Sequence, residues 1–303
     1  MAKIDPHKKK LLKIASIASV VTATSLLLLK FVAYWQTDSV SIMASLLDSM
    51  LDIVASLVNL VAIRYALVPA DKEHPFGHGK AEALAGLGQA TFIAGSACFL
   101  MIHAGSNISN PDNLQDLDVG IIVMLISTVV TGMLIIFQRY VYRQTNSIAI
   151  KADSVHYLTD LLSNTLVILA LGLVYWGLSW MDPVMAILIG IYILYSAWQI
   201  VSESIHMLLD RELDESIQEK VRALVLADPE VHAIHELKTR ESGHTQFIQL
   251  HIEMDGEINL YKAHDISDRI MAILEQAFPS AEILIHQDPF NDAPDESMRI
   301  TSA

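Results

Sequence analysis

Hydrophobic residues form six long stretches in the first two thirds of the chain, whereas charged residues return every few positions after Leu208. A helix needs about 20 apolar residues to cross the hydrocarbon core of a bilayer, and each stretch approaches or exceeds that length. The six predicted spans cover residues 14–35, 40–67, 81–106, 119–137, 148–176 and 183–201. The pattern predicts a six-helix transmembrane domain over residues 1–207 and a separate polar domain over residues 208–303.

The polar domain alternates between helical and strand-like patterns. Apolar residues recur at helical spacing over 214–226 and 260–278, while 231–240, 245–254 and 281–286 are rich in strand formers. We therefore expect an α-helical membrane protein that ends in a small α+β domain.

The negative charge of the chain is concentrated in this polar domain. The net charge is −14, and residues 208–303 hold 20 Asp and Glu against 8 Lys and Arg. Such an acidic surface repels nucleic acid, so we expect no nucleic-acid partner. The one cysteine, Cys98, lies in an apolar run, which excludes disulfides and leaves histidine and carboxylate as the ligands for any metal.

Lysine and arginine are distributed asymmetrically among the predicted connectors. They occur in the N-terminal tail and around the connectors that follow the second and fourth spans, but residues 36–39, 107–118 and 177–182 contain none. By the positive-inside rule, this multi-pass chain is expected to have both termini in the cytoplasm.

Two predicted spans carry ionisable residues at helical spacing. Asp48 and Asp52 lie four residues apart in the second span, and His156 and Asp160 repeat this spacing in the fifth. A carboxylate at the centre of a membrane costs about 2.5–3.5 kcal/mol on insertion scales, and a bound cation would remove this penalty. Four nitrogen and oxygen ligands suit tetrahedral zinc. The alternatives are a carboxylate pair solvated near the headgroups and a histidine that only packs in the core.

Further candidate ligands lie outside the spans. Asp71, His74 and His78 could form a three-ligand site on a turn, the alternative being an exposed polar loop. Six of the twelve histidines fall in the polar domain, and His232 and His244 among them are interpreted as solvated loop residues. Lys30, in the first span, is interpreted as a snorkelling or helix-pairing residue.

Taken in order, these motifs resemble the cation diffusion facilitator family, in its bacterial divalent-metal efflux branch. The resemblance is carried by four segments: Ser45–Ser56, His74–Glu82, Ala152–Asn164 and Phe247–Met254. It implies a homodimer in the bilayer of the bacterial inner membrane, with a cytoplasmic αββαβ domain of metallochaperone-like type that binds metal, regulates transport and dimerises.

The resemblance also implies three metal sites and one contact between domains. The implied transport site is Asp48, Asp52, His156 and Asp160; the loop site is Asp71, His74 and His78; and the binuclear cytoplasmic site is His235, His251, His264, His286 and Asp288. Asp288 would bridge the two metals. Lys80 and Asp210 would form a charge interlock that holds the protomers together.

The expected function is that of a proton-coupled antiporter rather than an enzyme. It would export divalent metal from the cytoplasm, zinc foremost, with cadmium or ferrous iron as further substrates. Metal ligands must be deprotonated to bind, so protons and metal compete for them. The alternatives are a divalent cation channel and an intramembrane metalloenzyme.

Overall fold

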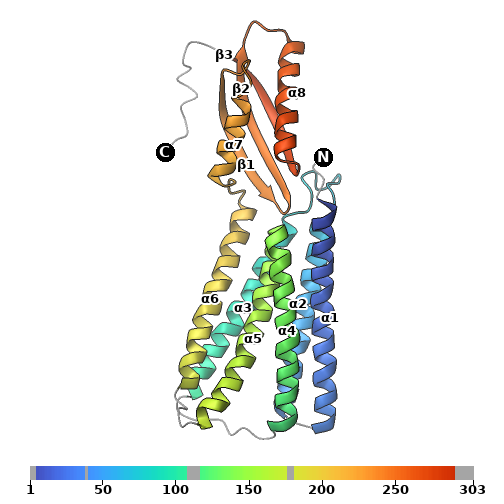
Figure 1. Cartoon of the computed structure of the whole chain (residues 1–303), viewed down its shortest axis with the longest axis vertical. Helices are drawn as coiled ribbons and strands as arrows, with labels where there is room; N and C mark the ends of the chain where they lie inside the picture. The colour runs from blue at the N-terminus through green and yellow to red at the C-terminus, as the bar shows by residue number, and fades with distance from the viewer. Residues whose placement is uncertain (1–4, 38–39, 108–116, 176–180, 291–303) are drawn as a thin grey trace. The chain divides into compact units, whose positions relative to one another are not determined.

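The computed structural model describes residues 5–37, 40–107, 117–175 and 181–290 of the chain (Figure 1). The chain divides into two compact units. One spans residues 5–209, and the described part of the other spans residues 210–290. We describe each unit by itself.

The first unit is a bundle of long helices. Its described helices are α1 (Pro6–Thr37), α2 (Val40–Ala66), α3 (Ala81–Asn107), α4 (Leu117–Thr145), α5 (Ile148–Tyr175) and α6 (Met181–Leu208). A helix satisfies all its backbone polar groups within one segment, which is what an apolar run requires in lipid. Several helices extend beyond the predicted spans, because their backbone continues through polar residues past the apolar core.

Five of these described helices are long and apolar enough to cross a membrane. In α5, side chains are described only as far as Leu166, and this described part carries the charged Lys151, Asp153 and Asp160. The predicted helical membrane domain is therefore confirmed, while the count of six crossings stays a prediction.

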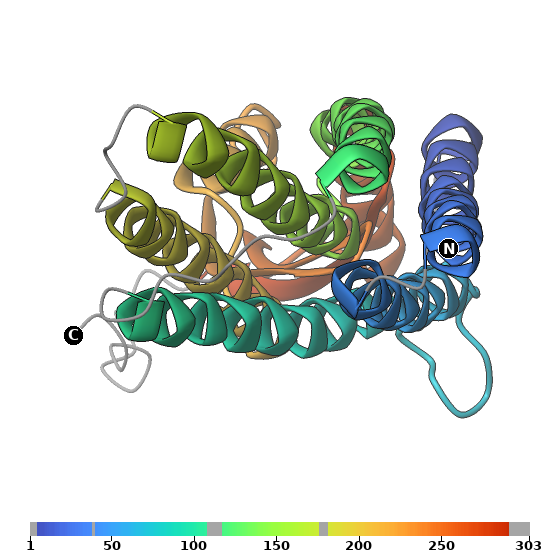
Figure 2. The ribbon, with the colours of Figure 1, turned by 90° about the horizontal axis from the view of Figure 1, so that it is seen from below.

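The helices pack closely where side chains are small. Figure 2 looks along the bundle and shows α3 passing beside α2, α5 and α6, which it contacts. At Gly190 on α6, an added Cβ would lie 2.4 Å from Met101 Cγ on α3, and at Gly86 on α3 it would lie 2.8 Å from Ile148. An added methyl group would force these neighbouring side chains to shift, so glycine permits the close approach that is common between membrane helices.

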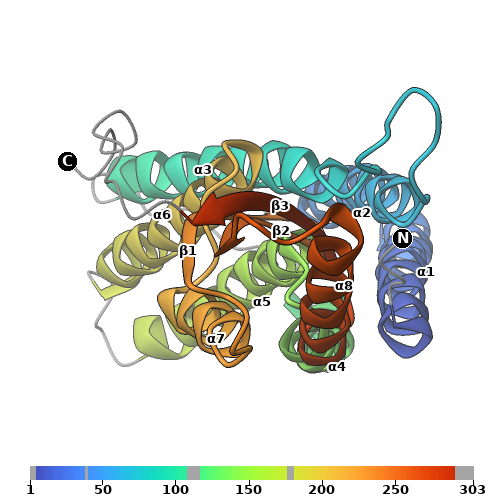
Figure 3. The same cartoon turned by 90° about the horizontal axis from the view of Figure 1, so that it is seen from above.

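The second unit has the element order αββαβ and confirms the predicted C-terminal α+β fold. Its elements are α7 (Glu215–Val225), β1 (Ala233–Ser242), β2 (Thr245–Asp255), α8 (Leu260–Ala277) and β3 (Ala281–Phe290). The sheet order is β1-β2-β3, with β1 antiparallel and β3 parallel to β2. Figure 3 shows α7 and α8 on one side of this sheet.

Alternation along β2 separates the core of this unit from the opposite face. Ile248, Leu250 and Ile252 are buried against α7 and α8, so the intervening His251 projects away from the core. The register pairs His251 with His235 of β1 and with His286 of β3. Three histidines from three strands thus lie in one row across the sheet.

Candidate metal centres

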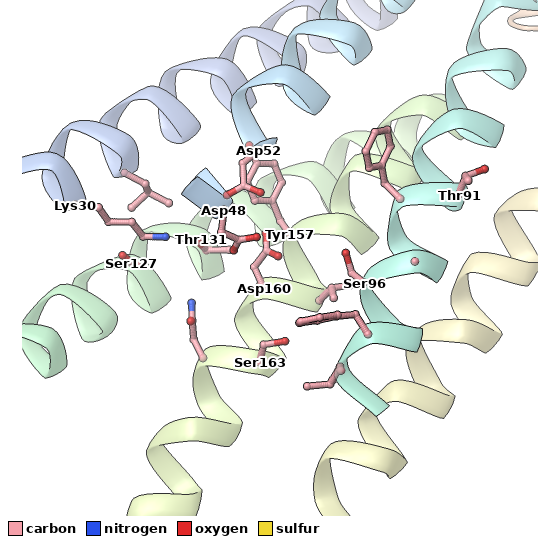
Figure 4. Close-up of a pocket in the computed structure, with 17 residues that line it drawn as sticks. Lys30, Asp48, Asp52, Thr91, Ser96, Ser127, Thr131, Tyr157, Asp160 and Ser163 are labelled. Carbon is pink, nitrogen blue, oxygen red and sulfur yellow. The ribbon is translucent and has the colours of Figure 1, made fainter. Parts of the chain in front are cut away.

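A cavity of about 550 Å³ lies among the helices of the first unit (Figure 4). Its lining comes from α1 to α5 and includes three of the predicted ligands, Asp48, Asp52 and Asp160. The cavity therefore gathers carboxylates from the second and fifth helices, which lie more than a hundred positions apart in the sequence.

Asp52, His156 and Asp160 form the membrane cluster. One ligand atom from each lies within 4.8 Å of the other two, and His156 Nε2 is 3.3 Å from Asp52 Oδ1. Asp52 is buried, and His156 Nε2 is a buried atom without a well-formed hydrogen bond among the described residues. Asp48 lies one turn from Asp52 and faces the same cavity, but it is outside the tight group. The cluster has the donor atoms that a divalent transition metal requires.

Sequence reasoning gave no role to Asp153, which lies one turn before His156. Its wholly buried carboxylate accepts hydrogen bonds from Ser19 Oγ at 2.5 Å, Gln138 Nε2 at 2.6 Å and Gln89 Nε2 at 3.0 Å. These partners come from α1, α4 and α3, so one side chain of α5 links three other helices. The signal in the sequence was the presence of serine and glutamine within apolar spans.

Replacing Asp153 with alanine is expected to lower the free energy of unfolding by about 2–4 kcal/mol. Gln89 Nε2 would lose its acceptor, at a cost of about 1–3 kcal/mol, while Ser19 Oγ and Gln138 Nε2 would each lose one of two acceptors. Removing a desolvated carboxylate partly offsets these losses. Denaturant unfolding of the detergent-solubilised protein measures this. The control is Ser25→Ala, which removes an exposed hydroxyl of α1 bonded only to its own helix. Equal stability of the two variants would contradict the prediction.

The predicted loop residues come together on a turn between α2 and α3. Asp71 Oδ1 is 3.5 Å from His74 Nδ1, and Asp71 Oδ2 is 3.4 Å from His78 Nε2. Gly77 has φ +82°, a conformation that favours glycine. The backbone N–H of His74, with that of Glu73, donates to the Asp71 carboxylate and lowers its pKa. Asp71 is therefore held ionised, as a metal ligand must be.

In the second unit, Asp288 lies at the centre of the histidine row. Its Oδ2 is 2.8 Å from His251 Nδ1 and 3.3 Å from His235 Nε2, and its Oδ1 is 3.2 Å from His286 Nε2. Both carboxylate oxygens thus face imidazoles, which is the arrangement a carboxylate bridging two metals would need. His264 is not brought into this group within one chain, because it lies on α8 beside Asp268, with 3.7 Å between the charged groups.

Two further contacts involve histidines of this unit. Glu253 Oε1 is 3.1 Å from His235 Nδ1, so a carboxylate that sequence reasoning missed lies behind this histidine. His232 stacks on Phe290 at 4.8 Å between ring centroids.

The predicted interlock joins residues of the two separate units. Within its own unit, Lys80 Nζ donates to the carbonyl of Leu208 at 3.2 Å. Within the other, Arg240 Nη1 donates to Asp210 Oδ1 at 3.1 Å. The pairing of Lys80 with Asp210 stays a prediction.

Comparison with protein families gives two matches that together cover most of the chain. Residues 16–209 match the cation efflux transmembrane domain, and residues 213–290 match the cytoplasmic domain of cation efflux proteins.

Curated relatives match over nearly the whole length. The cation-efflux pump FieF of Yersinia enterocolitica is 45% identical over 293 residues, 97% of this chain and 98% of that protein. The protein of the same name from Salmonella choleraesuis is 45% identical over 290 residues, 96% of this chain and 97% of its own. A crystal structure of the cytosolic domain of a cation diffusion facilitator family protein is 28% identical, covering 25% of this chain and 90% of that one, with a TM-score of 0.24.

The full-length relatives are named as pumps, and the family match extends through both units. The chain therefore belongs to the cation efflux family that its motifs resemble, and it is a multi-pass membrane transporter rather than an enzyme.

Proposed function

We propose that the chain exports zinc from the bacterial cytosol across the inner membrane in exchange for protons, with cadmium and ferrous iron as further substrates. The observation that carries this proposal is the membrane cluster, in which an imidazole and two carboxylates converge at a cavity that a third carboxylate also lines. Oxygen ligands alone suit manganese or magnesium, and the imidazole of His156 shifts the preference toward zinc.

Proton coupling follows from the chemistry of these ligands. Imidazole and carboxylate bind metal only when deprotonated, so protons arriving from an acidic exterior expel the metal. One set of ligands can therefore carry metal in one direction and protons in the other.

The position of the cavity along α5 supports alternating access. With both termini in the cytosol, α5 would run outward, and its cavity-lining residues extend from Tyr157 to Asn164. On this topology the cavity lies toward the exterior, and the Asp153 network lies on the cytosolic side of the membrane cluster. Metal entry from the cytosol would then require the helices to move apart at that network.

The second unit is proposed to bind two metal ions as a regulatory and dimerisation domain. The residues present supply suitable donor atoms for two metal ions, since three imidazoles surround the two oxygens of Asp288. The acidic domains of two protomers would repel one another, and bound metal would reduce this repulsion. In a homodimer, His264 could complete the site from either protomer.

Replacing both His251 and Asp288 with alanine is expected to weaken metal binding to residues 208–303 by at least about 100-fold, since losing even an outer partner of a metal ligand costs about 10–100-fold. This fragment has a hydrophobic core of its own, so it can be titrated with zinc by calorimetry. The control is His232→Ala, because His232 stacks on Phe290 rather than facing Asp288. Unchanged affinity and stoichiometry in the double variant would show that these residues are not ligands.

The choice of metal is tested by competition in proteoliposomes. Uptake of zinc is measured against added cadmium, ferrous iron and manganese. Zinc is expected to be transported, cadmium and ferrous iron to compete with it, and manganese to compete least. Equal competition by manganese would contradict the role given to the imidazole.

A further inference from the structure

Lys30 of α1 lies in the wall of the cavity described above and not at the lipid surface. It is 8% exposed, and it lines the same cavity as Asp48, Asp52 and Asp160. Figure 4 shows its ammonium directed into the side of the cavity that carries the carboxylates. The interpretation of Lys30 as a helix-pairing residue is confirmed, and its interpretation as a snorkelling residue is wrong, because the ammonium is buried within the bundle.

Two neutral acceptors on α2 hold this ammonium in position. Lys30 Nζ donates to Ser49 Oγ at 2.6 Å and to the carbonyl of Ser45 at 3.2 Å. Ser49 is fully buried and follows Asp48 directly in the sequence. Among the described residues, no carboxylate lies within salt-bridge distance of Lys30 Nζ. Lys30 therefore acts on the carboxylates through space and leaves their oxygens available to a metal.

The charged side chains that line the cavity, which do not include the hydrogen-bonded Asp153, match one divalent ion. Three carboxylates and one ammonium leave two negative charges when the imidazole is neutral. A bound divalent cation would bring this total to zero. In a medium of low dielectric constant such neutrality matters, because any residual charge carries a large desolvation penalty.

We propose that Lys30 is a fixed countercharge that matches the transport site to a single divalent cation and keeps the affinity low enough for release. This inference rests on the proposed function of the membrane cluster. Lys30 would then be a specificity-determining residue that repels the substrate ion. This repulsion weakens metal binding, whereas a site that bound metal too tightly would hold it throughout the transport cycle.

The test is zinc uptake by proteoliposomes containing the full-length Lys30→Met variant. Removing a positive charge beside a divalent ion is expected to lower the KM for zinc by about tenfold or more. The reason is that two charges interact strongly in a buried site, where the effective dielectric constant is low. The maximal rate is expected to fall as well, because the metal leaves more slowly. If Lys30 only tied α1 to α2, its loss would loosen the site and raise the KM instead.

Ions of different charge provide a second readout. Cadmium(II) and terbium(III) are used as inhibitors of zinc uptake, and their inhibition constants are compared between wild type and Lys30→Met. Coulomb energy scales with ionic charge, so a gain of about tenfold for cadmium predicts a gain of about thirtyfold for terbium. A change in packing alone would not make the change in inhibition constant depend on the charge of the ion.

Three further variants serve as controls. Lys30→Arg retains the charge and is expected to restore the KM toward that of wild type. Lys13→Met removes an exposed lysine on the same helix, roughly 25 Å away at 1.5 Å per residue, and is expected to leave the KM unchanged. Lys30→Gln is neutral but keeps a polar side chain with a hydrogen-bond donor, and it replaces Lys30→Met if the apolar variant fails to insert.

The outcomes separate this inference from the proposed function. If wild type transports no zinc, the proposed function fails. If wild type transports zinc and the neutral variants keep or raise the KM, or if cadmium and terbium gain equally, only the inference about Lys30 is overturned. If neither neutral variant inserts, Lys30 is required for folding and the inference is likewise overturned.

Discussion

Asp52→Ala is expected to abolish zinc transport, by at least about 100-fold, while the protein still inserts and dimerises. Asp52 is buried, and its Oδ1 lies 3.3 Å from His156 Nε2, so its loss removes one donor from the centre of the membrane cluster. The remaining ligands can no longer offset the cost of stripping water from a divalent ion. Because the helix keeps its hydrogen bonds and the new residue is apolar, insertion should not suffer.

Zinc flux into proteoliposomes measures this effect, with size-exclusion chromatography to check assembly. Asp5→Ala is the matched control, since it removes an exposed carboxylate just before α1 in the same unit. Normal flux from Asp52→Ala would refute the proposed transport site. Loss of flux from both variants would point to a general effect of removing charge.

The second large effect concerns the choice of metal. His156→Asp is expected to reduce transport of cadmium relative to manganese by at least about tenfold. The substitution keeps a ligand at the same position on α5 but makes the site oxygen-only, and such sites suit manganese. The variant should also need a more acidic exterior to release metal, because carboxylates take up protons at lower pH than imidazole when other effects are equal.

Competition fluxes of zinc against manganese and cadmium, in wild type and His156→Asp, measure this preference. The pH of the compartment that receives the metal is varied in the same assay. If the rank order of metals is the same in both proteins, the imidazole does not set selectivity, and helix packing around the site must do so.

The fold could be predicted because its main signals are local. Apolar runs mark the membrane helices, and alternation in β2 turns His251 away from the core. The four-residue spacing in α2 and α5 identifies Asp52, His156 and Asp160 within each helix. That the two helices bring these side chains within 4.8 Å of one another depends on packing, which the spacing does not encode.

The interactions that sequence reasoning missed are all non-local. Ser19 and Asp153 are separated by 134 positions, so no pattern within one span could pair them. The sequence predicts either snorkelling or helix pairing for Lys30, because its partner Ser49 lies on the next helix and an isolated lysine in a span is compatible with both. Glu253 faces His235 only because β1 and β2 pair in the observed register, which the alternation of each strand leaves open.

The coupling of metal efflux to protons is the central claim, and zinc accumulation in sealed proteoliposomes tests it most directly. The membrane voltage is clamped, and the lumen is made acidic or is brought to the external pH. The account predicts that an acidic lumen drives zinc above its equilibrium concentration, that zinc entry alkalinises the lumen, and that collapsing the pH gradient ends accumulation. Zinc that only equilibrates across the membrane, at the same rate with and without the gradient, would contradict the account and identify a channel.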